Sequence, residues 1–261
     1  MTEIEALLMG KGTALFQAPL ELVQFTGNIE ADELLNDLEN SPHAFVLACI
    51  MDRQIKAELA WLIPYELRKR IGTLEFQALA KLSDEEIRHY MTTPDSLHRF
   101  PNDMSTFLHK AINRIQSEYF GNAASIWGGS PSSSEVVYRF LQFDGVGPKI
   151  AAMSANILAR ELKVPFSDYY SIDISPDVHV HRVFRRLGLI EPDSSNEQLV
   201  YRARSISPEF PGLLDYPAWQ IGREWCRPRA PNCEDCYMKM NCPTAQQRLG
   251  DRRMAGAGGN H

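Results

Sequence analysis

Residues 143–149 read Phe-Asp-Gly-Val-Gly-Pro-Lys and give the main sequence signal for the fold. Gly145 and Gly147, two positions apart, permit a tight hairpin with positive φ. Pro148 has the fixed φ that suits the first turn of a following helix. Ser132-x-x-Glu135 has the pattern of a capping box upstream. Apolar residues recur at helical spacing on both sides of the stretch: Val136, Val137, Phe140 and Leu141 before it, and Ile150, Met153, Ile157 and Leu158 after it. The pattern predicts a helix–hairpin–helix.

The hairpin is also a candidate phosphate site. Backbone N–H groups at the start of a helix carry partial positive charge and bind anions. Contacts of this kind fix a protein on nucleic acid without reading sequence. We therefore expect Gly145, Val146 and Gly147 to contact the DNA backbone, with Lys149 following in the first turn of the helix.

Four of the five cysteines lie within 17 residues near the C-terminus, at Cys226, Cys233, Cys236 and Cys242. Four thiolates in one loop can hold a [4Fe–4S] cluster or a tetrahedral zinc ion. Zinc ribbons usually carry two C-x-x-C pairs, and only Cys233 and Cys236 form one here. The spacing favours the [4Fe–4S] cluster, with zinc and a disulfide as alternatives. Cys49 stands in an apolar run and is expected to be a buried small side chain.

Composition and charge are those of a globular protein. The chain has 261 residues and a formal net charge of −6. Residues 1–40 contain eight acidic residues and one basic residue, which leaves the other 221 residues at +1. A near-neutral body with local arginine clusters is compatible with DNA binding. The N-terminus lacks a basic signal-peptide start, and the longest apolar run is too short to span a bilayer. We expect no membrane association and a cytoplasmic location beside the nucleoid.

Helical patterns follow one another along most of the chain. A buried helical segment over 44–63 is predicted to break near residues 52–54 and to end before Pro64. Residues 249–261 end in MAGAGGNH and are expected to be disordered.

Together these motifs resemble the endonuclease III family of helix–hairpin–helix DNA glycosylases, over roughly residues 29–243. The cysteine spacing matches the family's cluster loop, and Lys149 stands at the position of the catalytic lysine. Asp177 opens a segment that resembles the one beginning with the family's aspartate, although Val178 replaces the usual Thr. Gln54 falls where the family has a glutamine that fills the gap left by an everted base. Its neighbours Asp52, Arg53, Ile55 and Lys56 depart from the family's small and polar residues.

The resemblance implies an all-α fold with two domains. Residues 42–164 would form a six-helix barrel that contains the helix–hairpin–helix. Residues 1–41 and 165–248 would form the iron–sulfur cluster domain from both chain ends, followed by the tail 249–261.

The implied function is a DNA repair glycosylase with abasic-site lyase activity, acting as a monomer on double-stranded DNA that contains a damaged base or an abasic site. Breaking the bond from C1′ to the base builds positive charge on the sugar, which a carboxylate such as Asp177 stabilises. A neutral Lys149 amine could attack C1′ and form a Schiff base. Arg227 and Arg229, held between two cysteines, are further candidates for phosphate contact.

Two alternatives stay open. In a monofunctional glycosylase, Asp177 would activate water and Lys149 would only bind DNA. In a non-catalytic DNA-binding protein, the cluster would be a structural clamp or a redox sensor. Asp177 also precedes an apolar helical stripe, so it could simply cap that helix. His179 and His181 are expected to pack, and the arginines at 182, 185 and 186 could form a solvated face.

Overall fold

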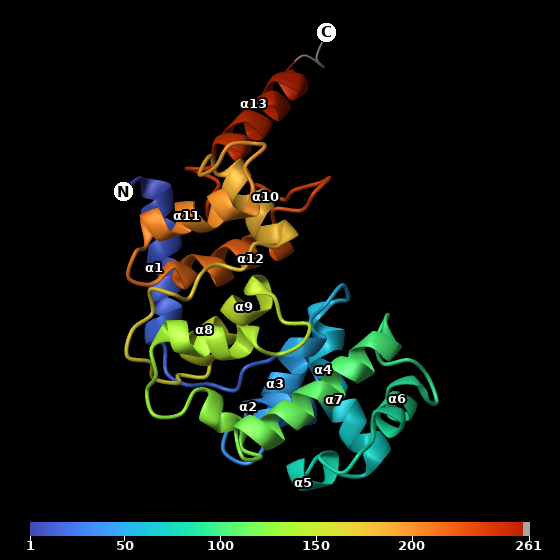
Figure 1. The fold of residues 1–261 in the computed structure, drawn as a ribbon. Coiled ribbons are helices and arrows are strands. Elements are labelled where there is room, and N and C mark those ends of the chain that lie inside the picture. The colour runs from blue at the N-terminus through green and yellow to red at the C-terminus, as the bar shows by residue number, and fades with distance from the viewer. Residues whose placement is uncertain (258–261) are drawn as a thin grey trace. The chain divides into compact units, whose positions relative to one another are not determined.

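The structure is a computed structural model that describes the backbone of residues 1–257 and the side chains of residues 1–250. All regular secondary structure in that part of the chain is helical (Figure 1). The elements are α1 Glu3–Gln17, α2 Ile29–Asn36, α3 Pro42–Met51, α4 Ala57–Ile71, α5 Phe76–Leu79, α6 Asp84–Thr92, α7 Pro101–Glu118, η1 Ala123–Ile126, α8 Ser133–Leu141, α9 Pro148–Arg160, α10 Val178–Arg186, α11 Asn196–Ile206, η2 Pro211–Leu214, α12 Asp215–Glu224 and α13 Pro243–Ala257.

The chain forms two compact units, Pro19–Ser167 and the pair of segments Met1–Ala18 and Asp168–His261. The domain boundaries expected from the sequence are between residues 41 and 42 and between residues 164 and 165 instead. Residues 19–41 group with the first of these units because α2 packs on α3 and α4. Phe25 stacks on Trp61 with ring centroids 4.5 Å apart, and the Tyr65 hydroxyl donates to Glu30 at 2.5 Å.

The unit of residues 19–167 is built around α3. All ten residues of this helix are buried, which explains its uninterrupted apolar run over residues 44–51 without a polar face. Helices α4, α7 and α9 pack against it. Pro64 lies inside α4 rather than beyond its end, so the predicted helix end there was wrong, while the predicted break at residues 52–54 is confirmed.

The second unit joins the two ends of the chain. Helix α1 packs against α12 and η2 (Figure 1). Its approach to η2 depends on Gly12, since a Cβ there would lie 2.1 Å from the Leu213 carbonyl oxygen. The core of this unit is apolar, with Leu8, Val183, Phe184 and Leu214 fully buried.

The predicted disorder of the C-terminal tail is not what the structure shows for residues 249–257, which continue α13. Leucine, arginine, methionine and alanine in this segment favour helix. Residues 258–261 lie outside the described part of the chain.

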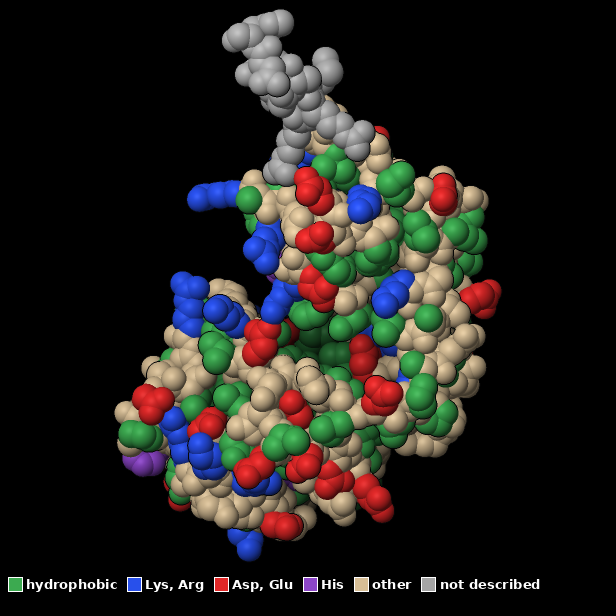
Figure 2. Space-filling view, turned by 180° about the vertical axis from the view of Figure 1, so that it is seen from behind, with side chains coloured by type: hydrophobic (Ala, Val, Ile, Leu, Met, Phe, Trp, Pro, Cys, Tyr) green, Lys and Arg blue, Asp and Glu red, His purple; other side chains and the backbone are tan. Residues whose placement is uncertain are grey.

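No helix among the described residues is both long and apolar enough to cross a membrane. Acidic and basic side chains are interspersed on the face shown in Figure 2. The net charge of −6 is therefore not expressed as a single acidic surface on that face.

Candidate functional site

The predicted helix–hairpin–helix is present as α8, residues 142–147 and α9. Ser132 caps α8 by accepting from the Glu135 N–H at 3.2 Å. The reciprocal half of the expected capping box is absent among the described contacts of this helix end, because the Glu135 carboxylate pairs with Arg139 instead.

The two glycines of the hairpin have different roles. Gly145 has φ +83°, and a Cβ there would lie 2.8 Å from the Phe107 ring. Gly147 has φ −102° and open space around the position of a Cβ. Gly145 is thus required by conformation and packing, whereas Gly147 leaves the surface of the hairpin unobstructed.

The hairpin presents backbone donors at the start of α9. Gly147 is the N-cap of this helix and Pro148 follows at its first position, as the sequence predicts. Among the described residues, no acceptor is found for the Gly147 N–H. A donor of this kind at the positive end of a 13-residue helix is suited to bind an anion such as a phosphate.

The loop between α3 and α4 is fastened to the hairpin. Arg53 donates to the Gly145 carbonyl oxygen at 2.6 Å, and its guanidinium lies over the Phe107 ring, 5.5 Å from the centroid. Gln54, the next residue, has φ +55° and is exposed. The structure therefore brings Gln54 beside the hairpin, two features that the sequence separates by about 90 residues.

Lys149 faces a carboxylate that the sequence analysis did not assign to the site. Its Nζ lies 3.5 Å from Oδ2 of Asp52. The Lys149 side chain is 41% exposed and that of Asp52 only 10%. Asp52 is the C-cap of the fully buried helix α3, and its N–H donates to the Cys49 carbonyl oxygen at 3.2 Å. A charged residue directly after an apolar helical run was the signal that could have identified it.

Asp177 caps α10. One carboxylate oxygen accepts from the N–H groups of His179 and Val180 at 2.8 and 2.7 Å. The predicted capping role is confirmed, and it leaves the second oxygen available for other contacts.

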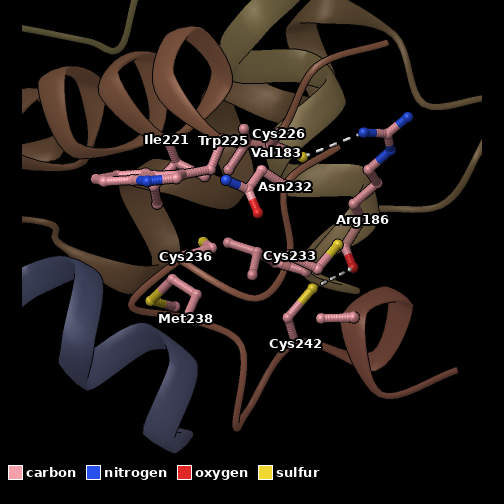
Figure 3. A pocket seen from close by; sticks show the side chains of 12 residues that line it. Val183, Arg186, Ile221, Trp225, Cys226, Asn232, Cys233, Cys236, Met238 and Cys242 are labelled. Carbon is pink, nitrogen blue, oxygen red and sulfur yellow. Dashed lines mark hydrogen bonds between the residues drawn. The ribbon is translucent and has the colours of Figure 1, made fainter. Parts of the chain in front are cut away.

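The four clustered cysteines line one cavity (Figure 3). They are free thiols, and the other lining residues are mostly apolar: Val183, Leu187, Ile221, Trp225, Met238 and Ala245, with Arg186 and Asn232. The disulfide alternative is therefore absent from these cysteines. Within the described residues, no group of three or more His, Cys, Asp or Glu converges on a single metal ion. Four thiols around one apolar cavity, rather than around one point, fit a cluster that takes a thiolate at each of several irons.

Burial affects the protonation of these ligands. It raises the pKa of Cys236 to about 11 and also raises the pKa of Cys242. Both thiols are therefore neutral near pH 7 until a cation replaces their protons.

Two arginines of α10 hold the cysteine loop, so the predicted solvated face is wrong for both. Arg182 donates to the carbonyl oxygens of Cys226 and Gly222 at 2.7 and 2.9 Å. Arg186 donates to Cys226 Sγ at 3.3 Å (Figure 3). It also donates to the carbonyl oxygens of Arg227 and Pro228 at 2.8 Å each.

Arg186 also accepts from the far end of the loop. Its own carbonyl oxygen receives the Cys242 thiol at 3.4 Å and the Thr244 hydroxyl at 2.8 Å. One residue thus ties the first and the last cysteine, and no local sequence pattern marks this role.

The other residues that the sequence singles out are two exposed arginines and two packed histidines. Arg227 and Arg229 are exposed on the loop that Arg186 holds. His181 bonds to the Ser194 carbonyl oxygen at 2.8 Å, and His179 packs against Gly222, so both histidines have the expected packing roles.

The predicted site residues divide between the two units. Gln54, the hairpin residues and Lys149 belong to the unit of residues 19–167. Asp177, the two loop arginines and the four cysteines belong to the other unit.

The sequence matches the profile of the HhH-GPD superfamily, described as base excision DNA repair protein, over residues 47–209. Endonuclease III of Thermotoga maritima is 27% identical over 160 residues, which span 59% of this chain and 66% of that protein. Endonuclease III homolog 1, chloroplastic, of Arabidopsis thaliana is 23% identical over 216 residues, spanning 77% of this chain and 49% of that protein. The alignments thus cover less than two thirds of these relatives.

Solved structures share the fold. A non-covalent endonuclease III–DNA complex has a TM-score of 0.62 at 19% identity, covering 96% of this chain and 99% of that one. A trapped endonuclease III–DNA covalent intermediate has a TM-score of 0.61 at 20% identity, covering 95% and 99%. A thermostable thymine-DNA glycosylase has a TM-score of 0.62 at 14% identity, covering 93% and 97%. The predicted all-helical fold is confirmed.

Proposed function

Because the chain belongs to the HhH-GPD superfamily of base excision DNA repair proteins, we propose that it is a DNA glycosylase with abasic-site lyase activity. Its substrate is double-stranded DNA that contains a damaged base or an abasic site, and it acts as a monomer. The observation that carries the lyase part is the placement of Lys149, an amine in the first turn of α9 directly after the hairpin.

The DNA contacts follow from the exposed donors of each unit. The hairpin amides at Gly145 and Gly147 bind a phosphate, with the α9 dipole favouring the negative charge. The third predicted donor, the Val146 N–H, already donates to the Phe143 carbonyl oxygen at 3.0 Å. Arg227 and Arg229 bind further phosphates. The damaged nucleotide must leave the base stack before its C1′ is reachable, and Gln54 fills the gap that it leaves.

The chemistry is assigned to two side chains. Asp177 stabilises the positive charge that develops on the sugar as the bond from C1′ to the base breaks. Lys149 attacks C1′ and forms a Schiff base, after which β-elimination cuts the strand on the 3′ side.

The cysteine loop would hold a [4Fe–4S] cluster through Cys226, Cys233, Cys236 and Cys242. When bound, the cluster supplies a cross-link among four points of the loop. The protein supplies the apolar cavity and the hydrogen bond from Arg186 to Cys226, and the loop so held presents Arg227 and Arg229.

A monofunctional glycosylase is the second candidate, and the ion pair of Lys149 favours it. A neighbouring carboxylate stabilises an ammonium group, and an ammonium group binds phosphate but does not attack C1′. In that case Asp177 activates water.

Borohydride trapping on a duplex with one abasic site tests the proposal. We expect a covalent enzyme–DNA adduct and a nicked strand for the wild type. Lys149→Gln should abolish the adduct while DNA affinity changes little, because one phosphate contact is a small part of the total.

Lys110→Gln is the matched control, since Lys110 also pairs with an aspartate beside the hairpin, Asp144, at 3.0 Å. It should trap like the wild type. If the protein releases a base from a panel of damaged duplexes but is never trapped, the monofunctional candidate is correct. If it neither releases a base nor nicks an abasic strand, it is a DNA-binding protein without catalytic activity.

A further inference from the structure

We propose that Asp52 is a catalytic group of the lyase reaction, which takes the proton that Lys149 must lose and returns it to the leaving oxygen. This inference rests on the proposed function and names a residue that the endonuclease III resemblance does not supply, since the family has small and polar residues around that position.

The first argument is proximity. Oδ2 of Asp52 lies 3.5 Å from Nζ of Lys149, and both residues belong to the unit of residues 19–167. A small approach brings the pair to the 2.6–3.2 Å at which a proton is transferred directly, and such distances commonly shorten when substrate binds.

The second argument is that the carboxylate is fixed in place. Asp52 follows the ten buried residues of α3, which anchor its backbone. The next residue, Arg53, is bonded to the hairpin at Gly145. The loop that carries the acid and the hairpin that precedes the amine are therefore held together, so that their separation is set by the fold.

The third argument is burial. The Asp52 side chain is 10% exposed, and aspartate is rarely so buried unless a charged partner compensates it. Asp52 also faces the buried thiol of Cys49, whose pKa is raised first by burial and further by the Asp52 charge. Asp52 lies between an apolar helix and the 41% exposed Lys149 side chain, so its carboxylate interacts with that lysine.

The proposed step balances as follows. The Lys149 ammonium gives one proton to the Asp52 carboxylate, and the amine lone pair forms a bond to C1′ of the open-chain aldehyde. The carbonyl electron pair moves to oxygen, which takes the proton back from Asp52. A second N–H proton then passes through Asp52 to that hydroxyl, which leaves as water while the nitrogen lone pair forms the C=N bond. Ammonium and aldehyde become iminium and water, and Asp52 ends as it began.

The test is single-turnover borohydride trapping on a saturating abasic duplex at pH 7. Asp52→Asn should slow trapping by about 100-fold or more, the lower end of what a positioned general base contributes. Its affinity for the abasic duplex should change by less than about threefold, because the carboxylate makes no phosphate contact. Asp52→Glu keeps the charge and should trap within about tenfold of the wild type.

Two further variants separate catalysis from structure. Asp144→Asn removes a different carboxylate, one that lies on the hairpin and pairs with Lys110, and should trap like the wild type. Asp52→Ala leaves space for a small acid, so added sodium formate should accelerate its trapping, whereas Lys149→Gln should gain nothing from formate.

The outcomes distinguish failure of the lyase function from failure of the role proposed for Asp52. Wild-type protein that never traps refutes the lyase function and this inference together. If the wild type traps and Asp52→Asn traps as fast or faster, Asp52 only stabilises the ammonium and the inference alone falls. Thermal melting accompanies each variant. If Asp52→Asn does not fold, the formate response of Asp52→Ala and the rate of Asp52→Glu decide, and loss of both overturns the role.

Discussion

Alanine at Gly145 should destabilise the fold and alanine at Gly147 should not, although the two glycines belong to one motif. Gly145 has φ +83°, where a Cβ costs roughly 1–2 kcal/mol. The added Cβ would also lie 2.8 and 3.0 Å from two carbons of the Phe107 ring. Phe107 cannot retreat freely because the Arg53 guanidinium lies over its ring. Overpacking of this kind costs about 1–3 kcal/mol. We expect Gly145→Ala to lower the free energy of unfolding by about 2–5 kcal/mol in total.

Gly147→Ala should be nearly neutral for stability. Its φ of −102° is allowed for alanine, and no atom lies within 4 Å of the added Cβ. The smaller entropy of the unfolded chain favours the variant by about 0.4–1 kcal/mol. Alanine is a poorer N-cap than glycine by a similar amount, so the net change should stay below about 1 kcal/mol.

Urea denaturation followed by far-ultraviolet circular dichroism measures both changes, with the slope of each transition checked against the wild type. DNA affinity then separates stability from function. A methyl group at Gly147 would stand where a phosphate approaches the hairpin, so this variant should bind duplex DNA more weakly despite normal stability. If Gly145→Ala is no more destabilising than Gly147→Ala, the hairpin packing described above is wrong.

Four further outcomes are expected. Protein purified without oxygen should contain about four irons and four sulfides per chain; stoichiometric zinc with no absorbance near 400 nm would contradict the cluster. Replacing Arg227 and Arg229 together by alanine should reduce the slope of log binding constant against log salt concentration by roughly one to two units. An unchanged slope would show that this loop does not contact DNA. Arg186→Met should speed the loss of iron to a chelator by releasing the Cys226 end of the cysteine loop, because it removes the side-chain hydrogen bonds to Cys226 Sγ and to the Arg227 and Pro228 carbonyl oxygens while the backbone carbonyl that accepts from Cys242 remains; Arg185→Met, its neighbour on α10, should not. Burial lowers the pKa of His43, which bonds to the Leu74 carbonyl oxygen at 2.7 Å. As the pH falls below about 6.5, the histidine is therefore protonated in the unfolded chain before it is protonated in the folded protein, and this favours unfolding. Between pH 7 and pH 5.5 the free energy of unfolding should decrease in the wild type, and it should decrease less in His43→Gln.

Parts of this protein were predictable because their signals are local. The hairpin needs only Gly145, Gly147 and Pro148 within a few residues, and flanking apolar residues then set helices on both sides. The four cysteines fall within 17 residues, so their spacing alone brings them to one loop. Asp177 as an N-cap follows from its place before a helical stripe. Conformational preferences and short-range hydrogen bonds act over such distances whatever the rest of the chain does.

Local sequence patterns gave wrong predictions where tertiary packing sets the end of a helix or the unit to which a segment belongs. Pro64 usually ends a helix, yet α4 continues through it, with Pro64 buried. Residues 19–41 look like part of an acidic N-terminal segment, but Phe25 and Glu30 find their partners on α4. In both cases, tertiary contacts outweigh a propensity of at most a few kcal/mol.

The helical fold, the family and a set of candidate residues are predictable from short stretches of chain. Which of these residues work together depends on how the helices pack. Arg53 reaches the hairpin across 92 positions and Arg186 reaches the cysteine loop across 40 or more, while Asp52 meets Lys149 by ending a buried helix. No periodicity encodes such pairs, since the distance between side chains so far apart in sequence is fixed only when the helices between them have packed.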